Sequence, residues 1–295
     1  MNISTLFSKN RSFWIALIIL FVVFLGLLFL ERTKYIINLV PRLRGEVSIG
    51  NGFVITCAKD NYPLIIREDD PLIGQQLRFL GTVKSIFSET IDDLCNSNGI
   101  TVEVGSNFGY NSVLLGKMLK EDGRIYCLEP NPSIFLYLRK NIIINDLESH
   151  CVLKNIAVSS ASGECSIEDY FTMSKLADGT YTKPDMIKVD CNTLDDEMKE
   201  EMRAIDLLTI DVPGLEFLIL GGASRILEHS NIKVVFMFDN AESSKNTDVR
   251  TELNNLHALG FRFYISREEN DISPITIDEI LDLESAVLIL SRKLL

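Results

Sequence analysis

Two acidic residues and two glycines stand where short apolar segments give way to turns. The first of these segments, residues 101–110, reads TVEVGSNFGY. Gly105 and Gly109 flank a turn there, and the lack of a side chain lets the backbone approach a ligand closely. Glu103 places a carboxylate just before the turn, where it suits a ligand with an ammonium or sulfonium group and repels a pyrophosphate.

A second acid, Glu129, ends the next apolar segment. A carboxylate at such a strand end can accept two hydrogen bonds from a ribose diol. One strand-end acid alone would be an ordinary exposed residue, but two on adjacent strand ends favour an adenosyl cofactor. Asn107 stands where a dinucleotide-binding G-x-G-x-x-G turn needs its second glycine, which disfavours a nicotinamide oxidoreductase. The chain also lacks a P-loop sequence.

The elements that must position these residues alternate regularly along the chain. Apolar runs predict seven buried strands at about 101–105, 124–129, 151–155, 206–211, 232–239, 261–266 and 286–291. Helical patterns separate most of them, and two further runs, 166–169 and 187–190, predict an inserted hairpin. The alternation predicts an α/β fold with a doubly wound, mostly parallel seven-stranded sheet and helices on both faces. Such sheets bind ligands at the carboxyl ends of their strands.

The chain before this region predicts a membrane anchor and a short preceding unit. Residues 13–30 read FWIALIILFVVFLGLLFL, 18 residues without a charge, which is long enough to cross a bilayer. The absence of an A-x-A-like cleavage site favours a retained single-pass anchor over a signal peptide. The predicted organisation is a tail (1–12), the transmembrane anchor (13–30), a juxtamembrane linker (31–50), an N-terminal hairpin and helix (51–100) and the core (101–295).

Composition and charge bear on location and partners. The chain has 29 Lys+Arg and 41 Asp+Glu, a net charge of −12, so nucleic acid is excluded as the main partner. Bases flank the apolar segment on both sides, and their count favours a cytosolic body, with the lumenal side left open. Six cysteines occur without C-x-x-C or zinc-site spacing, so free thiols are favoured over disulfides and no metal site is predicted.

The motifs together resemble the S-adenosylmethionine-dependent methyltransferases of the FkbM type, which have the class I methyltransferase fold. The resemblance runs from about residue 69 to the end. The family motif D/E-x-G-A-N-x-G is similar to EVGSNFG from Glu103, E-P-N-P is intact from Glu129, and the family's I-D-x-x-K-I-D-V-E-G-x-E resembles IDLLTIDVPGLE at 205–216. It implies S-adenosyl-L-methionine as cofactor, bound by Glu103, Gly105, Ser106, Asn107, Gly109, Glu129 and Asn131.

The resemblance also implies methyl transfer, commonly to an oxygen of a sugar or small-molecule acceptor. Asp211 is our candidate for the base or acceptor-orienting group, because it ends a predicted strand on the ligand-binding edge. It could equally be a carboxylate stabilised by the dipole of the following helix. Asp239 is the second candidate. The three histidines fall in positions that suit structural or solvated roles.

Two departures from the family pattern support a different hypothesis. Thr209 stands in place of the family lysine and Pro213 in place of the family glutamate. The intact motifs keep as the leading prediction a membrane-anchored methyltransferase that acts on a small-molecule or glycan hydroxyl and contacts the lipid bilayer through residues 13–30. The alternative is a catalytically inactive methyltransferase-fold membrane protein that acts as an interaction or trafficking module.

Overall fold

The structure is a computed structural model that describes residues 46–58, 62–68, 70, 74–80, 82–83, 85–169, 183–202, 204–229, 231–267 and 271–295. The predicted tail, the anchor and the linker up to residue 45 lie outside these residues. Within the described ranges, no helix is both long enough and apolar enough to cross a bilayer.

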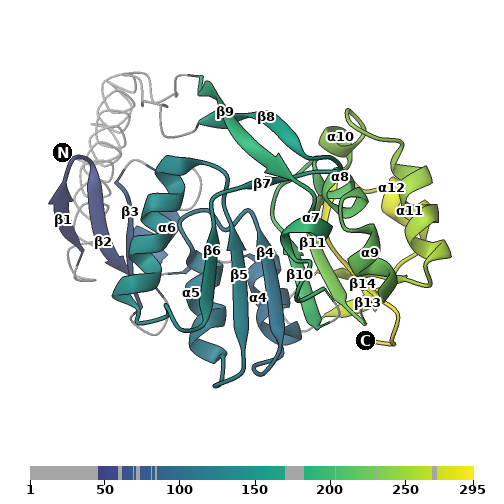
Figure 1. The fold of residues 1–295 in the computed structure, drawn as a ribbon, viewed down its shortest axis with the longest axis horizontal. Coiled ribbons are helices and arrows are strands. Elements are labelled where there is room, and N and C mark those ends of the chain that lie inside the picture. Colours follow the sequence, from purple (N-terminus) through teal and green to yellow (C-terminus); the bar gives the residue numbers. More distant parts are fainter. Residues whose placement is uncertain are drawn as a thin grey trace, which may run out of the picture.

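An eight-stranded sheet forms the centre of the molecule (Figure 1). Its order is β13 (Ile272–Pro274), β12 (Arg262–Ser266), β14 (Ser285–Ser291), β11 (Lys233–Asp239), β10 (Ile205–Ile210), β4 (Ile100–Val104), β5 (Arg124–Leu128) and β6 (Cys151–Lys154). The pairs from β11 to β6 are parallel, whereas β14 pairs antiparallel with both β11 and β12. The predicted doubly wound, mostly parallel sheet is thus confirmed.

The predicted strand number, seven, is wrong by one. The additional strand is β13, which pairs antiparallel with β12 at the sheet edge. It has three residues and includes Pro274, whose missing N–H restricts proline to edges and bulges. A segment so short and partly exposed carries no alternation of apolar and polar residues from which a strand could be predicted.

Helices cover both faces of the sheet, as predicted. One face packs against α4 (Ile86–Leu94), α5 (Tyr110–Met118) and α6 (Pro132–Ile144). The other packs against α7 (Leu194–Glu197), α8 (Glu216–Gly221), α9 (Ser224–His229), α11 (Val249–Ala258) and α12 (Ile277–Leu281). Neighbouring residues of one strand, such as Val234 and Val235, belong to opposite cores because side chains alternate across a strand.

Two three-stranded sheets flank the central one. The predicted N-terminal hairpin is present as β2 (Phe53–Cys57) and β3 (Pro63–Arg67), with α3 (Gly74–Leu80) against β2. A further strand, β1 (Val47–Gly50), pairs with β2, so the predicted linker 31–50 includes a strand at its end. All four β1 residues are exposed, which is why no burial pattern predicted it.

The inserted hairpin is present as β8 (Gly163–Asp169) and β9 (Asp185–Asn192), and β7 (Ala157–Val158) pairs with β9. These strands lie beyond the carboxyl ends of β4 to β6, along the upper edge of Figure 1.

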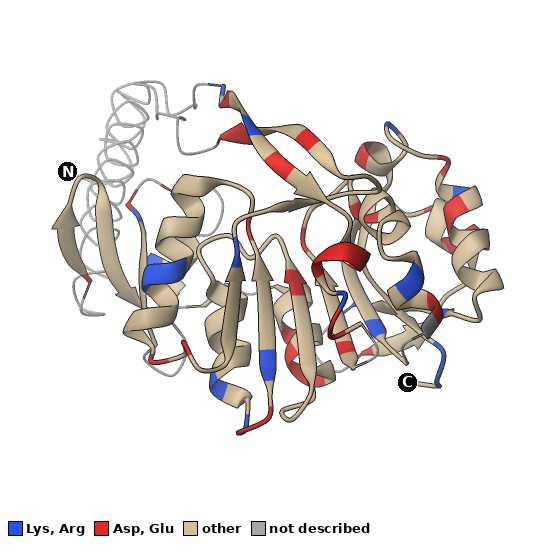
Figure 2. Ribbon diagram, in the orientation of Figure 1, with Lys and Arg blue, Asp and Glu red and all other residues tan. Residues whose placement is uncertain are grey.

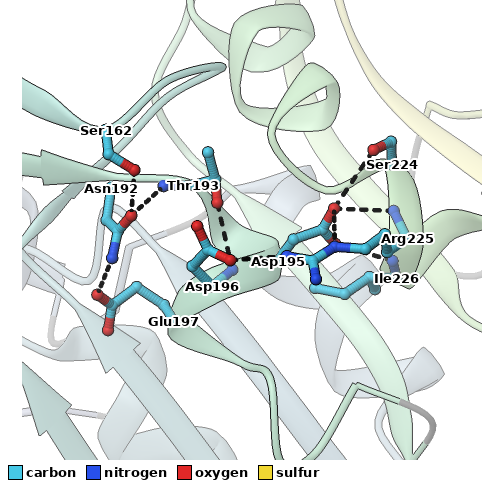
Figure 3. Close-up of polar contacts among 9 residues, drawn as sticks. All are labelled: Ser162, Asn192, Thr193, Asp195, Asp196, Glu197, Ser224, Arg225 and Ile226. Atoms are coloured by element: carbon cyan, nitrogen blue, oxygen red, sulfur yellow. Dashed lines mark hydrogen bonds and ion pairs between the residues drawn. The ribbon is translucent and has the colours of Figure 1, made fainter.

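A buried carboxylate fixes the end of this insertion to the core (Figure 3). Asp195, in α7 just after β9, is 4% exposed. Its Oδ2 accepts a hydrogen bond from the backbone N–H of Arg225 at 2.8 Å, and its Oδ1 accepts one from that of Ile226 at 2.9 Å. The Ser224 hydroxyl also donates to Oδ2, at 3.3 Å. The carboxylate therefore satisfies the first N–H groups of α9, which have no partner within the helix.

We predict that Asp195→Ala lowers the free energy of unfolding by about 3 kcal/mol, because two buried N–H groups lose their acceptor. Urea denaturation of the two proteins measures the difference. The neighbouring Asp196 is the matched control, since its exposed side chain pairs with Arg225 at 2.7 Å at the surface. Asp196→Ala should change stability by less than about 0.5 kcal/mol. Equal losses in the two variants would contradict the role given to Asp195.

Candidate functional site

The turn after β4 is a tight structure with an unusual backbone. Gly105, Asn107 and Gly109 all have positive φ values, of 85°, 51° and 85°. A β carbon at Gly105 would lie 2.8 Å from the carbonyl oxygen of Asp211. The backbone N–H of Asp211 in turn donates to the Val104 carbonyl at 3.0 Å. The turn and the end of β10 are thus in direct backbone contact, and only glycine fits at position 105.

Glu129 lies immediately after β5 and joins this turn to the start of α6. It is 6% exposed. Its Oε2 accepts a hydrogen bond from the Asn107 N–H at 3.0 Å, and its Oε1 accepts one from the Asn131 N–H at 2.9 Å. Burial raises the pKa of the Glu129 carboxyl to about 7, although both N–H donors favour the charged form. A carboxylate has about four acceptor positions, so the ionised group can accept further hydrogen bonds from a ligand.

Asn131 holds the neighbouring elements together through its side chain. Its Oδ1 accepts hydrogen bonds from the N–H groups of Ser133 and Ile134, which caps α6. Its Nδ2 donates to Asp169 of β8 at 2.7 Å. Because these bonds hold the side chain of Asn131 inside the protein, where it is 2% exposed, we expect Asn131 to act on the predicted cofactor site through the position of Glu129.

Glu103 points toward α5. It is 2% exposed and accepts a hydrogen bond from the Ser112 hydroxyl of that helix. Burial raises the pKa of the Glu103 carboxyl to about 7, Ser112 opposes the shift, and the nearby charge of Asp211 adds to it. Ser106 is also buried, and its hydroxyl donates to the Glu103 carbonyl at 3.3 Å. The side chains of Glu103 and Ser106 are therefore buried on the interior side of the turn.

Asp211 follows β10 directly, at the same edge of the sheet. Its side chain reaches solvent, yet the surrounding protein desolvates the charged form and raises the pKa of the carboxyl to about 6. α8 begins only at Glu216, so Asp211 does not cap it. Asp239, the second candidate, does cap a helix: its Oδ1 accepts from the Glu242 N–H at 3.0 Å, at the start of α10 (Asn240–Ser243). Of the two candidates for the base, Asp211 is therefore the one whose carboxylate caps no helix.

One residue of this region was missed in the sequence. Asn141 is fully buried on the inner face of α6. Its Nδ2 donates to the Phe108 carbonyl of the turn at 2.7 Å, and its Oδ1 accepts from the Ile65 N–H of β3 at 2.7 Å. A single asparagine in the apolar helical run FLYLRKNIII was the available signal, since a polar residue on a buried helix face must have partners.

The doubly wound, mostly parallel sheet, with the antiparallel strand β14 between β11 and β12, is a class I methyltransferase-like fold. The family described as Methyltransferase FkbM domain matches residues 103–263, more than half of the chain. The protein therefore belongs to the FkbM methyltransferases and depends on S-adenosylmethionine. No curated protein matches the sequence.

Several solved structures are similar to this chain. A methyltransferase FkbM from Methylobacillus flagellatus KT is 14% identical, with a TM-score of 0.45, and the match covers 75% of this chain and 55% of that one. An O-methyltransferase from Bacillus cereus in complex with SAH is 12% identical, with a TM-score of 0.40 and coverage of 71% and 82%. An rRNA methylase from Streptococcus thermophilus is 11% identical, with a TM-score of 0.38 and coverage of 69% and 92%.

The residues present at this edge fit the cofactor. Glu129 supplies a carboxylate at this edge and Glu103 a second one buried beneath the turn, and among the described residues no lysine or arginine forms an ion pair with either. Such a site suits a cofactor with a sulfonium and an ammonium group. Glu129 keeps acceptor positions for ribose hydroxyls, and the turn at Gly105 offers backbone without side chains.

We predict that Gly105→Ala destabilises the protein and weakens cofactor binding, because alanine meets both an unfavourable φ and the Asp211 carbonyl. Gly52→Ala is the control, since Gly52 has a similar φ of 76° but open space around its β carbon position. The loss at Gly52 should be about 1 kcal/mol, from backbone strain alone. The loss at Gly105 should exceed it by at least about 1 kcal/mol. Thermal unfolding and cofactor titration measure both effects, and equal behaviour would disprove the close contact.

We also predict that affinity for S-adenosylmethionine falls as the pH drops through about 7. Only the ionised Glu129 carboxylate can accept from both ribose hydroxyls, so protonation weakens binding. With a pKa of about 7, affinity should fall about tenfold from pH 8 to pH 6.

Calorimetric titration of the Glu129→Gln variant provides the control for this pH effect. The variant should bind about ten- to a hundredfold more weakly at pH 8, with little dependence on pH. Glu103 still titrates in this variant. An unchanged pH dependence would therefore assign the effect to Glu103 and contradict the prediction.

Proposed function

We propose that the protein is a membrane-anchored methyltransferase that methylates a hydroxyl oxygen of a sugar or other small molecule, with its body on the cytosolic side. The observation that carries the catalytic part is the position of Asp211. The backbone carbonyl of Asp211 lies against the glycine turn, and its side-chain carboxyl reaches solvent and is not used as a helix cap. The apolar segment 13–30 and the flanking bases support the anchor and its orientation.

Asp211 has the properties of a base for a hydroxyl acceptor. When bound, S-adenosylmethionine supplies a methyl group already activated by its sulfonium. The acceptor hydroxyl must lose its proton as the new bond to carbon forms, and the Asp211 carboxylate is the group that takes it. The pKa of about 6 leaves this carboxyl ionised at neutral pH and more basic than an ordinary aspartate.

The second candidate, an inactive interaction module, is favoured by Thr209 and Pro213. Thr209 is buried in β10 and pairs in register with Glu103, so this chain has a hydroxyl where the family has a lysine beside that acid. Pro213 is exposed two residues after Asp211. Both departures lie close to the proposed base. The effect of an Asp211 substitution on methyl transfer therefore decides between the enzyme and the inactive module.

We predict that Asp211→Asn lowers kcat by about 10²- to 10⁴-fold and leaves the Kd for S-adenosylmethionine within about twofold. The assay uses the full chain in lipid nanodiscs, labelled cofactor and a panel of sugar and small-molecule hydroxyl acceptors. At saturating cofactor, kcat of the wild type should fall as the pH drops below about 6, because the base becomes protonated.

Asp196→Asn is the control for this assay, because Asp196 is an exposed aspartate of α7 that takes no part in the proposed site. It should leave kcat unchanged. A chain that binds S-adenosylmethionine but methylates no acceptor would support the inactive module, and full activity of Asp211→Asn would remove Asp211 from the mechanism.

A further inference from the structure

Helix α6 presents an exposed face of apolar and basic side chains. Leu136, Arg139, Lys140 and Ile143 are all exposed, and their spacing of three, four and seven residues places them on one side of the helix. Leu136 is 49% and Ile143 44% exposed. Because these large apolar side chains are exposed to water, none of the described residues covers this face of α6.

A second apolar strip adjoins this helix. Val47 and Ile49 of β1 are 56% and 47% exposed. β1 pairs with β2, and Phe53 of β2 stacks on Tyr137 of α6 with ring centroids 4.1 Å apart. Figure 1 shows β1, β2 and α6 together at one end of the molecule. We call the exposed side chains of β1 and α6 the α6–β1 surface; they are Val47, Ile49, Leu136, Arg139, Lys140, Ile143 and Ile144.

The charge of this surface is opposite to that of the protein as a whole. Figure 2 shows basic and no acidic residues on α6, and the sequence 132–144 contains two bases and no acid. The Lys140 Nζ lies 4.4 Å above the Tyr137 ring, beside the apolar residues. In a chain with a net charge of −12, this face is therefore apolar and basic, and the exposed acids Asp146 and Glu148 lie beyond the end of α6. Apolar side chains with lysine and arginine beside them are the composition of protein surfaces that lie on anionic membranes.

The point at which the described chain begins also supports a membrane as the partner of this surface. The described residues begin at Glu46, directly before β1, so the chain enters the domain at the α6–β1 surface. The sequence between the apolar segment 13–30 and β1 contains four bases, Arg32, Lys34, Arg42 and Arg44, and two acids, Glu31 and Glu46, of which Glu46 pairs with Arg78 at 2.7 Å. Basic residues close to a membrane span are attracted to anionic headgroups.

We propose that the α6–β1 surface rests on an anionic lipid bilayer, with Leu136 and Ile143 in the interface and Arg139 and Lys140 at the headgroups. This inference rests on the membrane anchor of the proposed function. It adds an orientation, since the domain would lie on the membrane through α6 instead of moving freely on its linker.

Tryptophan quenching by brominated lipid tests the proposal. The full chain with Trp14→Phe has no tryptophan, because Trp14 is the only one. Leu136→Trp or Ile143→Trp is then added, and the chain is reconstituted in phosphatidylcholine vesicles with 30% phosphatidylglycerol. Asn254→Trp, on the exposed side of α11 at the other end of the sheet, is the matched control.

We expect brominated lipid to reduce emission at least twofold for Leu136→Trp and Ile143→Trp and to leave Asn254→Trp unchanged. Adding Arg139→Glu and Lys140→Glu should remove most of the quenching, as should vesicles without anionic lipid. Equal emission in brominated and plain vesicles would overturn the proposal. Blue-shifted but unquenched emission would do so too, by assigning the surface to a second copy or to residues 1–45.

Sedimentation separates this inference from the anchor. A chain that remains with the vesicles after alkaline washing, but shows no quenching at Leu136→Trp, keeps its anchor and lacks the proposed contact. A chain that is washed off lacks the anchor, and quenching at Leu136→Trp before the wash then decides whether the contact is present.

Discussion

The carboxyl edge of the sheet depends on the carboxylate of Glu129. It accepts backbone N–H groups from Asn107, in the turn after β4, and from Asn131, at the start of α6. Two turns that belong to successive strands are thereby held by one side chain. Asn131 extends the connection by capping α6 and bonding Asp169 of the inserted hairpin. The shape of the predicted cofactor site and the attachment of the insertion above it therefore share a common support.

The same means of attachment recurs elsewhere in the molecule. Asn141 joins the turn to the N-terminal sheet, and Asp195 joins the end of the insertion to α9. In each case a buried polar side chain satisfies backbone groups of a segment far away in the sequence. A buried carboxylate or amide is stable only with all its partners in place, so these contacts define the loop positions closely. α6 takes part in two of the three, and its outer face forms the proposed membrane contact.

Much of this fold follows from patterns that are visible in the sequence. The strands that carry Glu103, Glu129 and Asp211 are short, apolar and bounded by turn residues, so both their existence and the shared edge of the acids were predicted. β1 and β13 were not, because an exposed four-residue strand and a three-residue edge strand with a proline have no periodic signal. The pattern of apolar and turn residues also does not predict the directions of individual side chains. Asn131 follows Glu129 in an intact motif, but only the structure shows that its amide is used by α6 and Asp169.

The place of β14 has a consequence for the synthesis of the protein. This strand lies between β11 and β12 and pairs with both, whereas those two strands do not pair with each other. β14 is also the last strand of the sheet to leave the ribosome. Until it emerges, β11 has an open edge and β12 with β13 has no place in the sheet, and open edges invite pairing with other chains. A stop codon shortly before Ser285 would therefore remove the junction between two parts of the sheet, and we expect the chain to need protection from aggregation until Ser291 has left the ribosome.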